Sequence, residues 1–206
     1  MKRGTNVNWL VAVISAVVLA GCSRGPSRLV APEVSSKAGE IAVGKYDTDK
    51  DGRLNAQEIS ESPALNSAMA RIDKDGDSLI TAAEIDGRVN EWRDSRIALT
   101  SVMVTVRMDG RPLPDAVVSF VPESLMGDKT ETPKGTTDSR GMVRLRISDA
   151  PEGRGVRPGL YNIRVSKKKD GQETLPKKYS EGTDLGIEVV TNIFDSRNPI
   201  LNLTSR

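Results

Sequence analysis

The chain has 206 residues, of which 30 are basic, 28 are acidic and none is histidine, so its formal net charge is only +2. The lack of histidine excludes Ser-His-Asp and Cys-His catalytic groups and the usual histidine zinc sites. The charges are spread along the chain, and nothing in the sequence forms the concentrated basic face that nucleic-acid binding requires. This length suits two small domains, whose cores must be aliphatic because aromatic residues make up only 3% of the chain.

The N-terminus has the pattern of a secretory signal. Lys2 and Arg3 precede an apolar run over residues 9–19, which is too short for a mature transmembrane helix, and the sequence Leu-Ala-Gly-Cys follows. This ending resembles a bacterial lipobox, and the resemblance implies that residues 1–21 are a lipoprotein signal peptide. It also implies that Cys22, the only cysteine, carries lipid and anchors the protein in the cell envelope. Ser23 after the cysteine resembles a lipoprotein sorting signal for the outer membrane, which is therefore the expected location. An ordinary signal peptide with an incidental cysteine is the alternative.

Residues 22–35 mix Pro, Ser and Gly without periodicity, which predicts a lipidated tether. The next 62 residues, 36–97, carry a net charge of −4, and we call them the helical segment. Apolar spacing in this segment predicts helices over about 36–46, 63–72 and 82–96, with a further short helix before Ser62-Pro63.

A first twelve-residue run, DTDKDGRLNAQE over residues 47–58, places oxygen donors at alternate positions and ends in glutamate; we call it loop 1. Its donors at positions 1, 3, 5, 7, 9 and 12 are Asp47, Asp49, Asp51, the carbonyl of Arg53, Asn55 and Glu58. A hard cation such as calcium takes six to eight oxygen ligands, which such a turning backbone supplies. Gly52, at position 6, suits the sharp bend.

A second run, DKDGDSLITAAE over residues 73–84, repeats the pattern; we call it loop 2. Its donors are Asp73, Asp75, Asp77, the carbonyl of Leu79, Thr81 and Glu84. The two runs resemble the EF-hand family, and the resemblance implies two calcium ions and a short β-bridge between Leu54 and Ile80. Ser78 stands where the family has glycine, so we expect strain of roughly 1 kcal/mol and a weaker second site. A single run of this kind is often only a solvated turn, but two complete runs favour metal binding.

From Leu99 the apolar period changes to two, which predicts an all-β segment over residues 98–206, the β segment. Six strands are expected within residues 101–108, 116–122, 141–148, 159–166, 186–191 and 200–205, and a seventh at 134–137. We therefore predict a multidomain protein, with an α domain followed by an antiparallel seven-stranded β-sandwich. We also expect the cores of the two segments to be separate.

Three stretches, DGRPLPDAVVSFVPE, TTDSRGMVRLRI and PGLYNIRVS, resemble carboxypeptidase regulatory-like domains over about residues 101–168. The resemblance implies a transthyretin-like (prealbumin-like, Ig-like) sandwich, a fold used for support, adhesion or glycan contact. Fold alone does not imply a function.

We expect a calcium-binding, lipid-anchored envelope protein with a structural or adhesive role, whose β segment contacts an envelope protein or glycan. No P-loop or dinucleotide fingerprint is present, so we expect neither enzymatic activity nor a small-molecule substrate. One alternative is a carbohydrate-binding module in which calcium only stabilises the fold. Sugar binding would then need exposed aromatic side chains among Phe120, Tyr161, Tyr179 and Phe194. The other is a dockerin-like protein-binding module, suggested by the duplicated calcium loops.

Overall fold

A computed structural model describes residues 34–148 and 153–205. The signal peptide, Cys22 and most of the predicted tether lie outside the described residues. Val34, near the end of that tether, is buried in the hydrophobic cluster formed by the helices, so tertiary packing begins before residue 36. Within the described ranges, no helix has both the length and the apolar character needed to cross a bilayer.

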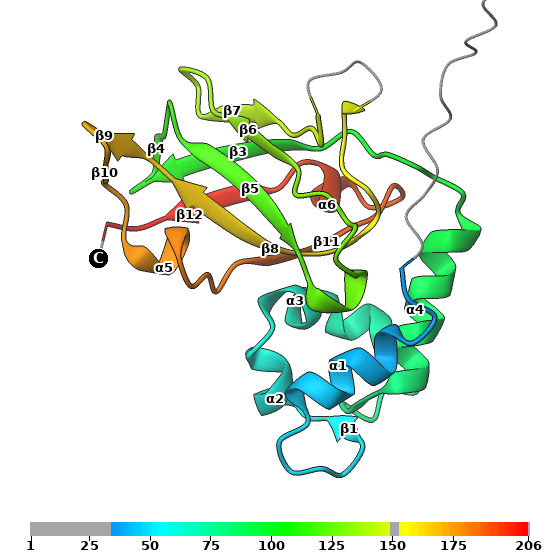
Figure 1. Ribbon diagram of the computed structural model, residues 1–206. Helices are drawn as coiled ribbons and strands as arrows, with labels where there is room; N and C mark the ends of the chain where they lie inside the picture. The colour runs from blue at the N-terminus through cyan, green and yellow to red at the C-terminus, as the bar shows by residue number, and fades with distance from the viewer. Residues whose placement is uncertain (1–33, 149–152, 206) are drawn as a thin grey trace, which may run out of the picture.

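The protein contains both helices and sheets, and the helices of the helical segment lie together on one side of the sheets (Figure 1). The helical segment contains α1 (Ala38–Tyr46), β1 (Arg53–Leu54), α2 (Ala56–Ser60), α3 (Pro63–Ile72), β2 (Ile80–Thr81) and α4 (Ala82–Asp94). Helix α3 begins where the sequence predicts, because the Ser62 hydroxyl accepts a hydrogen bond from the Leu65 amide and Pro63 fills the first helical position.

Gly39 determines how closely α1 packs on α4. A Cβ atom at Gly39 would lie 2.0 Å from the carbonyl oxygen of Ala82, and the Gly39 amide donates to Oδ1 of Asp86 at 2.8 Å. Glycine costs about 1 kcal/mol of helix propensity relative to alanine. Glycine is nevertheless required at this position, because any side chain there would push α1 away from α4.

The β segment forms two four-stranded sheets. In one, the order is β11-β8-β5-β6, and in the other β3 pairs with β12, β4 and β7. The strands are β3 (Met103–Met108), β4 (Arg111–Pro112), β5 (Val117–Pro122), β6 (Lys134–Thr136), β7 (Met142–Arg144), β8 (Gly159–Ser166), β11 (Gly186–Val189) and β12 (Ile200–Leu203). A hairpin of β9 (Lys168–Lys169) and β10 (Gln172–Glu173) and the short helices η1 (Ser124–Met126), α5 (Lys177–Ser180) and α6 (Phe194–Arg197) complete the segment.

Each stretch in which we predicted a strand contains one, but the prediction of seven antiparallel strands was wrong in two respects. The two sheets hold eight strands, because the two-residue β4 pairs with β3 just after the turn at Asp109-Gly110. Strand β12 runs parallel to β3, with Ile200 opposite Thr105. Alternation of apolar residues identifies a strand but carries no information on its direction.

The prediction of separate cores was correct for the β segment, whose sheets enclose a core of their own, but wrong for the helical segment. One hydrophobic cluster fills the space between the sheets and includes Val104 and Phe120. The other is built on the helices, yet it also contains residues from η1, from β8 and from the position just after β11, namely Leu125, Met126, Leu160 and Val190. The helical segment therefore shares its core with the β segment.

Candidate metal centre

Loop 1 joins α1 to α2, and loop 2 joins α3 to α4. Strands β1 and β2, which lie within these loops, pair antiparallel with Leu54 opposite Ile80. Both side chains are fully buried. The bridge predicted between the loops is confirmed, and it holds the two loops side by side.

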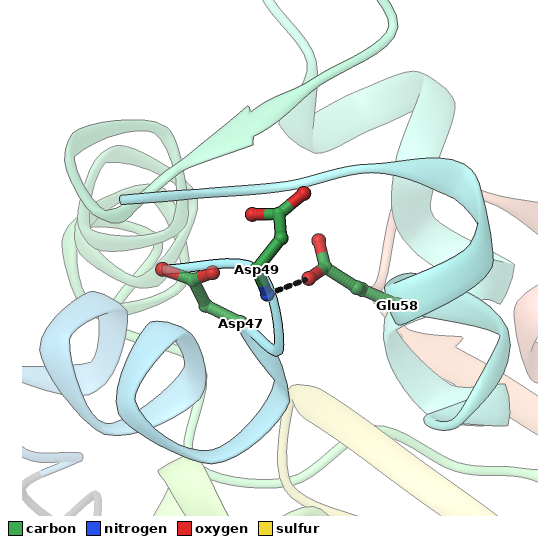
Figure 2. Close-up of side chains that lie close together, drawn as sticks. All are labelled: Asp47, Asp49 and Glu58. Atoms are coloured by element: carbon green, nitrogen blue, oxygen red, sulfur yellow. Dashed lines mark hydrogen bonds between the residues drawn. The ribbon is translucent and has the colours of Figure 1, made fainter. Parts of the chain in front are cut away.

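Each loop brings together the carboxylates of positions 1, 3 and 12. In loop 1, ligand-capable oxygens of Asp47, Asp49 and Glu58 all lie within 4.8 Å of one another, and Figure 2 shows the three side chains clustered between the two ends of the loop. The second loop gathers its carboxylates in the same way, within the same distance, from Asp73, Asp75 and Glu84. Three carboxylate groups so close together repel one another, and a cation between them would remove that repulsion.

The first aspartate of each loop is held by backbone amides of its own loop. Oδ1 of Asp47 accepts from the amide of Lys50 at 2.6 Å, and Oδ2 accepts from that of Gly52 at 2.9 Å. Asp73 accepts the equivalent bonds from the amides three and five residues later, at 2.7 and 3.1 Å. The two loops therefore share one backbone conformation, although they differ in sequence at more than half of their positions.

Glu58 closes loop 1. Its Oε1 accepts from the amide and hydroxyl of Thr48, at 2.7 and 2.9 Å, and its Oε2 accepts from the amide of Asn55 at 3.0 Å. The backbone amides of Asn55 and Thr48 are the main reason that the pKa of Glu58 is lowered to about 2. Glu58 is therefore ionised at neutral pH, as a calcium ligand must be.

Glu84 closes loop 2 through the equivalent backbone amides, but its hydroxyl donor is at position 9 instead of position 2. It accepts from the amide of Lys74 at 2.9 Å and from the amide and hydroxyl of Thr81 at 2.9 and 2.8 Å. Burial raises the pKa of Glu84, but together the hydrogen bonds from Thr81 and Lys74 outweigh it, so the pKa lies below the ordinary value.

The residues predicted as ligands at position 9 act as helix N-caps. Oδ1 of Asn55 accepts from the amides of Gln57 and Glu58 at the start of α2, and the Thr81 hydroxyl accepts from the amide of Glu84 at the start of α4. Each position-9 residue forms a reciprocal capping box with the glutamate of position 12. The cap thus fixes the glutamate relative to the helix that follows.

The position-5 aspartates, Asp51 and Asp77, are not part of the two three-carboxylate groups. Their Oδ2 atoms lie 3.7 and 4.0 Å from the guanidinium of Arg53, which stands between the loops. We predicted a role only for the Arg53 carbonyl, and the bridging side chain was missed. Only the β1–β2 pairing brings this side chain near Asp77, so the loop pattern alone contains no signal for it.

Ser78 adopts φ 66°, as predicted for position 6 of loop 2. Loop 1 also contains a non-glycine residue with a positive φ, which we did not predict. This residue is Lys50, at position 4, with φ 63°, and the equivalent residue of loop 2 is Gly76. Each loop therefore combines one glycine with one strained residue, at about 1 kcal/mol each. Strain at Ser78 gives no reason for loop 2 to bind more weakly than loop 1.

The two acidic groups offer only oxygen donors, and clustered carboxylates of this kind suit hard cations better than zinc or copper. Among the described residues, they are the places where at least three carboxylates converge closely enough to hold a metal ion. The predicted lipidation site, Cys22, lies outside the described residues. Comparison with protein families, curated proteins and solved structures finds no match to this chain.

Proposed function

We propose that this protein is a calcium-binding, lipid-anchored cell-envelope protein with a structural or adhesive role, built from a paired EF-hand and a carboxypeptidase regulatory-like β-sandwich. The proposal rests on one observation above all: two loops of different sequence gather the carboxylates of positions 1, 3 and 12 through the same hydrogen bonds. If the loops were only solvated Asp-rich turns, there would be no physical reason for the same arrangement to form in two loops of different sequence.

In the proposed site, each loop would surround one ion with its carboxylates, one backbone carbonyl at position 7 and the oxygen of position 9. Glu58 and Glu84 would each supply both of their oxygens. The hydrogen bonds that now hold these carboxylates keep them ionised and near their working positions, so little rearrangement would be needed when calcium binds.

A structural or adhesive role for the β segment is supported by its two sheets packed around a common hydrophobic core. Saccharide binding would favour exposed aromatic rings. Of the four candidate rings, Phe120, Tyr161 and Tyr179 are buried in that core, and Phe194 is 68% exposed. This distribution favours a protein or polar partner over the carbohydrate-binding alternative. The lipid anchor rests on the sequence around Cys22.

Calorimetric titration of calcium into the full chain, kept soluble in a mild non-ionic detergent, tests the proposal. We expect two ions per chain, and one ion in each of the variants Glu58→Gln and Glu84→Gln, because each removes the charge of one position-12 ligand. Magnesium, which demands a tighter octahedral shell, should bind more weakly. A wild-type chain that takes up no calcium would refute the proposed function.

A further inference from the structure

Two carboxylates of the β segment are buried where the helices meet the sheets. Glu123 follows β5 and is 2% exposed, and Glu188 lies on β11 and is 1% exposed. Burying an ionised carboxylate costs several kcal/mol unless hydrogen bonds and opposite charges compensate. The partners that compensate these two come mainly from the helical segment.

Glu123 contacts residues on both sides of loop 1. Its Oε1 accepts from the hydroxyl of Tyr46 at 2.6 Å and from Nζ of Lys45 at 3.2 Å, and these are the last two residues of α1, directly before Asp47. Its Oε2 accepts from the hydroxyl of Ser62 at 2.9 Å. Ser62 follows α2, the helix at the other end of loop 1.

Helix α2 is tied to this contact through the backbone. The amide of Ser62 donates to the carbonyl of Ile59, in the last turn of α2, at 3.0 Å. On the β side, Asn162 of β8 donates to Oε2 of Glu123 at 2.9 Å and accepts from the Ala64 amide at 3.2 Å. Glu123 therefore fixes both ends of loop 1 relative to the sheet.

Glu188 stands in the same relation to loop 2. It forms an ion pair with Nε of Arg71, in the last turn of α3 and two residues before Asp73. It also accepts from Nε of Arg88 at 2.6 Å and from the indole nitrogen of Trp92 at 2.8 Å, both on α4. One buried carboxylate thus joins the helix that enters loop 2 to the helix that leaves it.

The contact between α3 and β11 has no room to adjust. A Cβ atom at Gly186, the first residue of β11, would lie 1.9 Å from the carbonyl oxygen of Pro63, the first residue of α3. The last residue of helix α3, Ile72, directly precedes Asp73, so the position of α3 on the sheet sets the entry to loop 2. Because this packing leaves no free space, a displacement of β11 would displace α3 as well.

We propose that Glu123 and Glu188 are positioning residues for calcium binding: each fixes the helices at the two ends of one loop, and so sets the distance between that loop's first and last carboxylates. Glu123 acts on loop 1 and Glu188 acts on loop 2. The inference rests on the proposed calcium function. By thermodynamic linkage, calcium in a loop must strengthen the matching contact with the β segment by the same factor.

Variants with a single calcium site test this assignment, again in the full chain. Glu84→Gln leaves loop 1 as the working site, and Glu58→Gln leaves loop 2. Adding Glu123→Gln should weaken calcium binding about 5- to 150-fold in the loop 1 background, the range of typical coupling between sites, and change it less than about twofold in the loop 2 background. Adding Glu188→Gln should do the reverse.

Glu173→Gln is the matched control. Glu173 accepts hydrogen bonds from the hydroxyl of Ser166 at 2.6 Å and from the amide of Lys167 at 2.9 Å. Like Glu123 and Glu188 it has several hydrogen-bond donors, but it lies in the β9–β10 hairpin. It should leave both sites unchanged. A role limited to fold stability would weaken both loops equally, and that outcome, or no change in either loop, would overturn the proposal.

Two milder variants keep the test decisive if a buried glutamine prevents folding. Tyr46→Phe removes one hydroxyl and should weaken loop 1 alone, and Arg71→Gln should weaken loop 2 alone. Indole fluorescence of Trp92 gives a second readout, which should respond to calcium in loop 2 and lose that response in Glu188→Gln. If the wild-type chain binds two ions and these variants bind as it does, the positioning proposal fails while the calcium function stands.

Discussion

The hydroxyl of Tyr46, the last residue of α1, lies 2.6 Å from Oε1 of Glu123, a buried carboxylate 77 residues later in the chain. Burial alone would raise the pKa of Glu123. Hydrogen bonds, chiefly from Tyr46 and Asn162, outweigh it and lower the pKa to about 2. The pairing therefore makes the stability of the helix–sheet contact depend on pH.

Because the folded-state pKa of Glu123 lies below the ordinary value of 4.5, its contribution to the free energy of unfolding is complete above about pH 4.5. That contribution is lost as the pH falls from about 4.5 to about 2. Urea unfolding at several pH values should show wild type more stable than Glu123→Gln by roughly 2 kcal/mol at neutral pH, with the difference shrinking toward pH 2. A difference independent of pH would contradict the assignment of the low pKa to Glu123.

Replacing either strained loop residue with glycine should stabilise the protein. Lys50→Gly and Ser78→Gly each relieve a left-handed conformation that costs about 1 kcal/mol, which should raise the free energy of unfolding by up to about 0.5 kcal/mol after the larger entropy of the unfolded glycine is subtracted. Lys129→Gly is the control, since Lys129 is exposed and is not in the left-handed region. It should be neutral or destabilising by up to about 1 kcal/mol, and equal effects at all three positions would argue against strain.

Two glycines are needed for close approach and should not tolerate alanine. Gly39→Ala and Gly186→Ala place a Cβ about 2 Å from the backbone oxygens of Ala82 and Pro63, and each should destabilise the fold by about 1–3 kcal/mol. Gly44 lies in the same helix as Gly39, but a Cβ atom there would meet no neighbouring group within 4 Å, so Gly44→Ala should stabilise by up to about 1 kcal/mol. Thermal unfolding of the variants separates the two cases.

The β segment should not behave as an independent unit. Cutting the chain to residues 98–206 would expose Leu125 and Leu160 and leave Glu123 and Glu188 without their partners from the helices. We expect this fragment to bind a hydrophobic dye and to self-associate, in contrast to the full chain in calcium. A monomeric fragment that binds no dye and melts as cooperatively as the full chain would contradict the shared core.

Lipid attachment is expected at Cys22 alone, because the thioether can form only on that sulfur. Cells grown with radioactive palmitate should label the wild-type protein and leave Cys22→Ala unlabelled. The serine at residue 23 is a control position, and Ser23→Ala should leave labelling intact. Labelled Cys22→Ala, or unlabelled wild type, would exclude this anchor.

Much of the candidate site could be predicted from the sequence, because the contacts that form it are local. In loop 1, the bonds from Asp47 to the amides of Lys50 and Gly52 span at most five residues, and Glu58 reaches back only ten. The start of α3 was equally predictable, since Ser62 caps its own helix. A pattern read along the chain can specify such contacts completely.

Only the tertiary structure decided how the loops are held. The partners of Glu123 and Glu188 lie 61 to 117 residues away, apart from the adjacent Ser124 and from Asn162. No periodicity links residues so far apart, and in the sequence each of these glutamates has the appearance of an ordinary surface residue.

The parallel pairing of β12 with β3 and the bridge that Arg53 forms to Asp77 were undetermined for the same reason. Apolar alternation and loop spacing specify which residues are buried and which oxygens converge locally. The direction of a strand and the partner of a buried charge depend on how distant segments pack, and that packing exists only in the folded chain.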